Sequence, residues 1–445
     1  MLPVASQGFV LPCTITTSGN AWNGEVAFGL WQATAANGSI GSYLIVMKTD
    51  GTVEYVRQSN YPAPNYEVAK NIAQNTLLYQ GDPPVGGSDT SVLLTTHIWS
   101  YVTNTTVDFP SVIGHHDIEY NPINNTFLTL QEYLNPVNGT PTLFDTIVEL
   151  DAQGNILWSW DVGAHIPLSE ADPYGPTTIF NGTTVSDFTH SNALQWDYNN
   201  NIVYLNCRHI NTFYKINMTT GNLIWACGEY GNFTLLSENG TQVKSLWYHS
   251  HGTFQIAPDI FEMFDNDFAN ETNPNDCRSR MIELALNETS MTAYVNWEWD
   301  APPPYWSYAL GNTAVLPNGD RMGVFGVPSH QRPENAPWSF NDTGAVIVEV
   351  DPAGNVVRTY TFPVGWAIYR VQPLIHPTMA PSPAPTTTPT ASPTFSPSPT
   401  QVPPIPAFPK ETAFWMLLAT GIATVAVAVG FRGKAKNRLK PSCPA

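Results

Sequence analysis

One hairpin pattern recurs along most of this chain and restricts its fold more than any other feature. Each copy is an apolar run, a turn of Asp, Asn or Gly, and a second apolar run that often ends in an aromatic residue: LIVMKTDGTVEYV from Leu44, TIVELDAQGNILWSW from Thr146, TFYKINMTTGNLIWACG from Thr212, RMIELALNETSMTAYVNWEW from Arg280 and AVIVEVDPAGNVVRTYTF from Ala345. Such turns suit positive φ at Gly or Asn, so each copy predicts an antiparallel hairpin. Long helical periodicity is scarce, which favours an all-β fold.

The spacing of these hairpins predicts a repeat architecture. From Thr146 onward the copies begin 66, 68 and 65 residues apart, and the first gap of 102 has room for two shorter units, the second around residues 91–109. Further strand pairs lie between the hairpins, in TFLTLQEY, ALQWDYNNNIVYLNC, TFQIAPDIFEMFDN and NTAVLPNGDRMGVFG. Six units of about four strands predict a six-bladed β-propeller over residues 1–376. A double-sheet sandwich is the competing all-β fold, but it would not explain so regular a period.

The C-terminal end has a different composition. Residues 377–410 are rich in Pro, Thr and Ser, which predicts a disordered, extended stalk. Residues 412–431 carry no charge and are long enough for one transmembrane helix, and residues 432–445 form a basic tail. The positive-inside rule places that tail in the cytoplasm and the propeller outside, as a single-pass ectodomain at the cell membrane. A buried globular helix at 412–431 is the alternative.

Charge and export signals bear on partners and location. Asp and Glu outnumber Lys and Arg by 36 to 18, giving a net charge of −18 that argues against nucleic acid as a partner. The first residues lack the basic and apolar regions of a signal peptide, so we expect a truncated start. Eleven glycosylation sequons support an exported glycoprotein, at Asn37, Asn104, Asn124, Asn138, Asn181, Asn217, Asn232, Asn239, Asn270, Asn287 and Asn341.

The cysteines leave the disulfide pairing open. Cys13, Cys207, Cys227 and Cys277 precede the stalk and allow three connectivities, while Cys443 lies in the basic tail. No Cys or His spacing resembles a zinc site, so no metal and no cofactor are predicted.

Histidines mark the candidate site. HHDIEYNP from His115, HSNALQWD from His190 and HSHGTFQI from His249 each place histidine just ahead of an inner strand. His116, His190 and His251 are 74 and 61 residues apart, close to one repeat, so three neighbouring blades would each bring an imidazole to one mouth of the channel. Arg208 would add a fixed cation there.

Each of these residues also has a structural explanation. His115 and His116 could form a loop hydrogen bond, His190 could cap a turn beside Asp187, and one of His249 and His251 could hold the other. Arg208 could anchor a strand to a carboxylate. The repeated position of the histidines favours a shared site.

These segments, with LNCRHINTFYKIN, the FDN of FEMFDN and the closing YRVQ, resemble the arylsulfotransferase family that needs no nucleotide sulfate donor. The resemblance covers about residues 40–372 and implies a six-bladed propeller. It also implies sulfuryl transfer from an aryl sulfate ester to a phenolic acceptor, by a ping-pong mechanism through a sulfo-histidine. It places the nucleophile at His251, with oxyanion-binding or proton-transferring roles for His116, His190 and Arg208. Weaker substrate-binding candidates are His115, Asn192 and His249, and His249 is the alternative nucleophile.

Two other functions fit the same architecture. One is a non-catalytic, glycosylated cell-surface propeller that serves binding or adhesion. The other is a different propeller enzyme, such as a quinone- or metal-dependent oxidoreductase or a lyase, with the histidines as ligands. The non-catalytic protein differs from the sulfotransferase in whether His116, His190, Arg208 and His251 share one pocket, and a metal held by two or more of the histidines would favour the other propeller enzyme.

Overall fold

The computed structural model describes residues 9–32, 41–59, 68–83, 93–170, 177–180, 183–267, 278–300, 306–326 and 344–375. All of them belong to the first of two compact units, Met1–Ala380; the second is Pro381–Ala445. The described residues are almost entirely β-structure, with one short helix, α1 (Val162–His165), and one 3-10 turn, η1 (Leu168–Glu170). The all-β prediction is confirmed.

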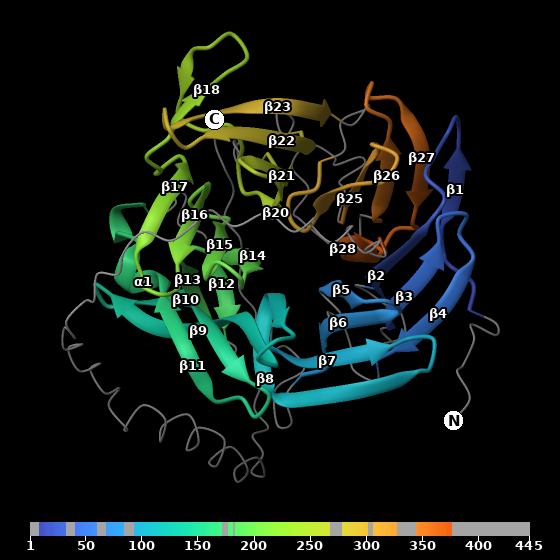
Figure 1. Cartoon of the computed structure of the whole chain (residues 1–445), viewed down its shortest axis with the longest axis horizontal. Coiled ribbons are helices and arrows are strands. Elements are labelled where there is room, and N and C mark those ends of the chain that lie inside the picture. Colours follow the sequence, from blue (N-terminus) through green and yellow to red (C-terminus); the bar gives the residue numbers. More distant parts are fainter. Residues whose placement is uncertain are drawn as a thin grey trace, which may run out of the picture. The chain divides into compact units, whose positions relative to one another are not determined.

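Four of the sheets are separate from one another, and Figure 1 shows the sheets set around a common centre, as in a propeller. The first has the order β28 (Trp366–Pro373), β2 (Glu25–Gln32), β3 (Ser42–Lys48), β4 (Val53–Gln58). The second runs β14 (Ser191–Asp197), β15 (Ile202–Cys207), β16 (Thr212–Asn217), β17 (Leu223–Gly228). The third runs β19 (Gln242–Val243), β18 (Thr234–Leu236), β23 (Thr292–Asp300), β22 (Arg280–Asn287), β21 (Ile260–Asp265), β20 (His251–Ala257). The fourth runs β1 (Thr14–Thr17), β27 (Val356–Thr361), β26 (Val346–Val350), β25 (Arg321–Phe325), β24 (Asn312–Val315).

The fifth sheet has nine strands, because one long strand belongs to two antiparallel units. One unit is β5 (Ala69–Ala73), β6 (Thr76–Gly81), β7 (Leu94–Ser100) and β8 (Thr105–Asn121); the other continues from β8 through β9 (Thr126–Val137), β10 (Thr140–Asp151) and β11 (Ile156–Asp161). β13 (Thr183–Asp187) joins β10 in parallel and pairs with β12 (Thr177–Phe180). The prediction of six separate blades is therefore wrong: the described strands form five hydrogen-bonded sheets.

The recurring hairpins appear where their sequences predict them. The five copies form the pairs β3/β4, β10/β11, β16/β17, β22/β23 and β26/β27. In the second copy, Asp151 accepts hydrogen bonds from the backbone N–H groups of Gln153 and Asn155, and Gly154 takes φ +83°. The turn chemistry therefore acts as the sequence indicates.

The ends of the described β-structure close the ring of sheets. β1 adds to β27, while β28 near the other end of the unit pairs with β2. The core lies in layers between neighbouring sheets: Phe213, Trp225, Phe261 and Ile282 fill one such layer. A second layer lies between the first and fourth sheets and contains Val26, Phe28, Met322, Ile347 and Ile368. This arrangement excludes the sandwich alternative, whose core would be a single layer between two sheets.

Side chains connect the inner strands of different sheets. Asn312 donates to the carbonyl of Val371 and accepts from its N–H, both at 2.9 Å, and so joins β24 to β28. Gln195 makes the same two-way contact with the backbone of Gln255, which joins β14 to β20. These strands are not paired with one another through backbone hydrogen bonds. The side-chain contacts therefore give hydrogen-bond partners to backbone groups that would otherwise lack them.

Glu262 on β21 also contacts the backbone of another sheet, and it gives a testable pH dependence. Its Oε2 accepts from the N–H of Val315 at 3.1 Å, and burial raises the pKa of Glu262 from 4.5 to about 8. Between pH 4.5 and about 8 the Glu262 carboxyl is protonated in the folded protein but ionised in the unfolded chain. The free energy of unfolding therefore falls as the pH rises through this range, by about 1.4 kcal/mol per pH unit. Glu262→Gln keeps the acceptor and removes this loss.

We therefore expect the free energy of unfolding of Glu262→Gln to exceed that of the parent protein by an amount that grows with pH. Urea unfolding at about pH 5 and about pH 8 measures it, and the excess should be at least ~1 kcal/mol larger at the higher pH. A difference that is the same at both values would contradict the raised pKa.

Several predictions fall partly or wholly outside the described residues. Cys13, Cys207 and Cys227 are not in disulfides, and Cys277 lies outside the described ranges. The stalk, the transmembrane segment 412–431 and the basic tail also lie outside them. Within the part of the chain that the structure describes, no helix is long and apolar enough to cross a membrane.

Candidate active site

The predicted histidines converge from three neighbouring inner strands. The rings of His116 and His190 are 4.9 Å apart between centroids, and His115 is 4.8 Å from His116. The Tyr369 ring on β28 lies 5.9 Å from His116 and 6.0 Å from the His251 ring, and so connects the two. The structure therefore brings together the imidazoles that the repeat predicts.

The backbone at these histidines is unusual. His116, His190 and His249 have φ values of +58°, +47° and +55°, a region that non-glycine residues rarely occupy. At the same places the strand register slips, between His115 and Ile118, between Ser191 and Ala193, and between His251 and Phe254. Bulges of this kind re-aim side chains and collect at functional sites. The repeated distortion supports a shared role for the three strand starts.

His251, the first residue of β20, is held in a defined tautomer. Its Nδ1 lies 2.7 Å from Oδ1 of Asn266, whose Nδ2 donates to the carbonyls of Ser307 at 2.6 Å and Leu310 at 2.9 Å. Because the amide nitrogen is committed to two carbonyls, Oδ1 is the acceptor and His251 Nδ1 carries the proton. The unprotonated Nε2 therefore keeps its lone pair.

His251 is also kept uncharged. It is 1% exposed, and burial, then the positive charge of Arg208, lowers its pKa well below 6.5. A neutral imidazole with a free Nε2 lone pair is the form that attacks an electrophile.

Arg208 lies at the end of β15, in the second His-led segment. Its backbone N–H donates to the carbonyl of His190, and its Nη2 donates to the carbonyl of Tyr308 at 2.9 Å. Of the charges that act on His251, that of Arg208 has the largest effect on its pKa, and Arg208 also lowers the pKa of His209 after burial and His190. The predicted cation is therefore at the histidine cluster.

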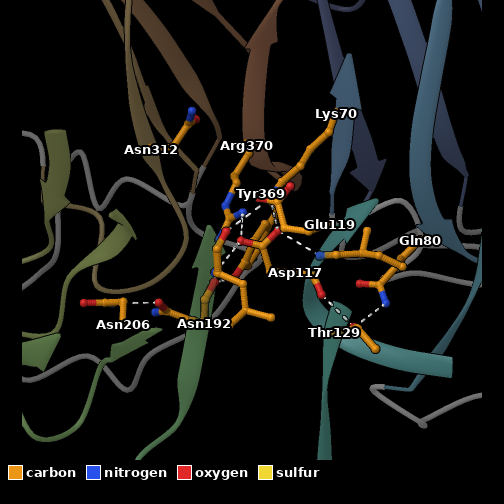
Figure 2. Close-up of polar contacts among 12 residues, drawn as sticks. Lys70, Gln80, Asp117, Glu119, Thr129, Asn192, Asn206, Asn312, Tyr369 and Arg370 are labelled. Carbon is orange, nitrogen blue, oxygen red and sulfur yellow. Dashed lines mark hydrogen bonds and ion pairs between the residues drawn. The ribbon is translucent and has the colours of Figure 1, made fainter. Parts of the chain in front are cut away.

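His116 directly precedes Asp117, which is the centre of a buried ionic network shown in Figure 2. Asp117 on β8 pairs with Arg370 on β28 at 2.8 Å and with Lys70 on β5 at 2.7 Å, and Lys70 also pairs with Glu119 at 2.6 Å. Burial, followed by the charges of other histidines and Arg370, lowers the pKa of His116 well below 6.5. This network joins β5, β8 and β28 next to His116 in the chain.

The weaker candidates occupy more enclosed positions. His115 is 1% exposed, its Nε2 lies 3.6 Å from Asp145, and burial lowers its pKa to about 3. Asn192 is fully buried, donating to the carbonyl of Ser250 and accepting from Asn206. The backbone N–H of His249 donates to Asn211, and its ring lies 5.7 Å from that of His209. These three residues are therefore buried next to the cluster and hold its surroundings in place through hydrogen bonds and ring contacts.

Sequence reasoning gave no role to several residues of the cluster. The ring of His209, which directly follows Arg208 in LNCRHIN, lies 4.7 Å from the His190 ring at a tilt of 31°. Asn266 ends the FDN segment, and Tyr369 and Arg370 begin YRVQ. All three residues therefore lie in segments that carry the family resemblance. Asp187 was considered only as part of a turn. What the sequence could not supply was the contact that each one makes.

Two groups have the residue types and spacing to hold a metal ion. They are Asp187 with His190 and His209, and His115 with Glu132 and Asp145, each with ligand atoms within 4.8 Å of one another. Carboxylates therefore lie beside the histidines, although the sequence predicts no metal site. In the first group the potential ligand atoms already pair, His190 Nδ1 lying 2.7 Å from Asp187 Oδ2.

Comparison with known protein families places this site in context. A family model described as Arylsulfotransferase (ASST) matches residues 100–370, which is more than half of the chain. The chain belongs to the arylsulfotransferase family. The match extends from Ser100, the last residue of β7, to Arg370 and so contains every predicted site residue. At the level of the family it supports aryl sulfotransferase activity.

Comparison with curated proteins gives no match. Among solved structures, a protein of unknown function from Bacteroides caccae is similar at 11% identity and a TM-score of 0.41, covering 79% of this chain and 99% of that one. A periplasmic gluconolactonase from Pseudomonas aeruginosa has 13% identity, a TM-score of 0.41 and coverage of 79% and 100%. A putative 6-phosphogluconolactonase from Bacteroides fragilis has 10% identity, a TM-score of 0.34 and coverage of 78% and 97%. These likenesses carry no information about the activity of this chain.

Proposed function

We propose that this protein transfers a sulfuryl group from an aryl sulfate ester to a phenolic acceptor through a sulfo-histidine at His251. The observation that carries the proposal is the bond from His251 Nδ1 to Asn266, which leaves Nε2 unprotonated, together with a lowered pKa that keeps the ring neutral. Membership of the arylsulfotransferase family supports the reaction class.

In the first half-reaction, the Nε2 lone pair of His251 attacks sulfur, an N–S bond forms, and the S–O bond to the aryl group breaks. The aryl oxygen leaves with the bonding electrons as a phenolate, which becomes a phenol when it takes a proton. In the second half-reaction the acceptor oxygen attacks the same sulfur, the N–S bond breaks, and His251 returns to its neutral form. One protein group must therefore move a proton to the leaving oxygen or from the attacking oxygen.

The neighbouring side chains suit the remaining roles. Negative charge spreads over the sulfuryl oxygens in the transition state, and a fixed cation in a desolvated site stabilises it. Arg208 is that cation, held by the Tyr308 carbonyl. His116 and His190, whose rings are 4.9 Å apart, can donate to sulfuryl oxygens or transfer the proton. No cofactor is required for these steps.

The assay that tests this proposal uses 4-nitrophenyl sulfate with and without phenol. We expect one equivalent of nitrophenol per protein without acceptor and continuous release with it, as a ping-pong mechanism requires. Release that is continuous without any acceptor would indicate hydrolysis instead. A non-catalytic surface propeller would release none.

The membrane arrangement also remains a proposal, and it rests on sequence alone. The uncharged run 412–431 with the basic residues after it favours a single-pass anchor with the propeller outside. Alkaline carbonate extraction of membranes checks it, since an anchored chain stays in the membrane fraction and a chain without an anchor is released.

A further inference from the structure

We propose that Asp187 is a positioning residue that, with His209, orients His190 so that Nε2 of His190 takes the proton of the acceptor phenol. This inference rests on the proposed sulfuryl transfer and assigns its proton-transfer step to one histidine. Asp187 lies at the end of β13, a strand that its parallel pairing with β10 places beside the histidine cluster.

The hydrogen bonds of Asp187 define the proton positions on His190. Asp187 Oδ2 lies 2.7 Å from His190 Nδ1, and a carboxylate accepts hydrogen bonds. His190 Nδ1 therefore carries a proton, and in the neutral ring Nε2 is left as the base. A carboxylate in this position also stabilises the imidazolium that forms when Nε2 receives a second proton.

His209 holds the other side of this arrangement. Its Nδ1 lies 3.2 Å from the backbone carbonyl of Asp187, and its ring packs 4.7 Å from the His190 ring with a tilt of 31°. Burial, followed by His190 and Arg208, lowers the pKa of His209 well below 6.5, so it presents a neutral face. Both imidazoles therefore contact the same aspartate, His190 at its side chain and His209 at its backbone carbonyl. These contacts leave the His190 ring little freedom to rotate.

A separate contact fixes the backbone of His190. Asp145 Oδ2 accepts from the hydroxyl of Thr189 at 2.6 Å and from the N–H of Ser191 at 2.7 Å, the residues on either side of His190. Asp145 therefore holds the turn, including the left-handed φ of His190, without using Asp187. A substitution at Asp187 can therefore change the orientation and tautomer of the His190 ring while the Asp145 hydrogen bonds keep the backbone in place.

The location of His190 suits proton transfer at the sulfur held by His251. The His190 ring lies 4.9 Å from the His116 ring, and the His116 and His251 rings lie 5.9 and 6.0 Å from the same Tyr369 ring, so the three imidazoles belong to one site. As the acceptor oxygen attacks sulfur, its O–H bond breaks and the proton moves to His190 Nε2. In the opposite direction the same proton serves a leaving phenolate. Asp187 accepts from Nδ1 throughout.

The test compares acceptors and leaving groups in Asp187→Asn. A 4-nitrophenolate leaves without protonation, so the single-turnover release of nitrophenol without acceptor should change less than about tenfold. Turnover with phenol, which must lose a proton to react, should fall about 10² to 10⁴-fold. A phenol as acidic as 4-nitrophenol should recover most of that loss as acceptor. Glu170→Gln removes a carboxylate that contacts Tyr214 and is the matched control, expected to behave like the parent protein.

The outcomes separate this inference from the proposed function. If the parent protein shows no stoichiometric nitrophenol release, the sulfo-histidine mechanism fails and the role of Asp187 fails with it. If the parent is active but Asp187→Asn turns over phenol within about threefold of it, only the positioning role is overturned. Equal losses in both half-reactions, whatever the acidity of the acceptor, also overturn it, because they indicate a structural effect.

A second measurement does not depend on activity. The ¹⁵N chemical shifts of the His190 ring report which nitrogen carries the proton in the neutral form. We expect protonated Nδ1 in the parent protein and a mixture of tautomers in Asp187→Asn. A parent ring protonated at Nε2 would overturn the assignment.

Discussion

Replacement of His251 by alanine is expected to abolish sulfuryl transfer, with both the stoichiometric and the acceptor-dependent release of nitrophenol reduced by about 10⁴-fold or more. The reason is that Nε2 of this ring is the atom that forms the N–S bond, and the bond from Nδ1 to Asn266 sets the tautomer that allows it. Release of nitrophenol in a stopped-flow or steady-state assay measures both phases.

The control for this variant is His165→Ala. His165 is an exposed histidine at the end of α1 whose ring stacks on Trp160 at 4.3 Å, away from the cluster. It should retain full activity. A surviving stoichiometric phase in His251→Ala would move the nucleophile to another ring, and the same phase should then disappear in His249→Ala or His116→Ala.

Replacement of Asp117 by asparagine is expected to cost 3 to 5 kcal/mol of folding free energy, on the order found when one partner of a buried ion pair is removed. Asp117 is fully buried and accepts from Arg370, Lys70 and the N–H of Leu194 (Figure 2). Burial alone would raise its pKa, but the charges of Arg370 and Lys70 outweigh burial and hold the pKa of Asp117 below 3.8. Without the carboxylate, two cations remain beside one acid.

Glu119→Gln is the matched comparison for Asp117→Asn. Glu119 contacts Lys70 from the more accessible side, with its side chain 22% exposed, and burial raises its pKa. Its loss leaves Lys70 and Arg370 paired with Asp117, so we expect a cost of about 1 kcal/mol. Urea unfolding measures both variants. A cost for Asp117→Asn no larger than that for Glu119→Gln would mean that the network does not hold the inner strands together.

The hairpins could be predicted because their signals are local. A turn such as DAQGN carries its own hydrogen-bond acceptor and its own glycine, and no distant residue is needed to form it. The long strand β8 could not be predicted, because Pro110 and Gly114 resemble the end of a strand. In the structure the pairing slips between Thr95↔Ile113 and Thr96↔Phe109, and this irregularity accommodates a proline without breaking the strand. That one strand joins two predicted blades into one sheet.

The site shows the same division between local and distant information. The histidines could be found because each repeat places one at the start of an inner strand. The partners that determine their chemistry could not, because Asp117 and Arg370 are 253 residues apart and Asn266 meets His251 only where β20 and β21 pair. A sequence shows which groups are present in a repeat, whereas tautomer and charge depend on the contacts that those groups make in the folded chain.

The most direct test of the central claim is the mass of the protein after reaction with 4-nitrophenyl sulfate in the absence of any phenol. Rapid quenching at alkaline pH, digestion and mass spectrometry should find one added sulfuryl group on the peptide that contains His251, and added phenol should remove it. A sulfuryl group on another residue, or an unmodified protein that has nevertheless released nitrophenol, would contradict the sulfo-histidine at His251.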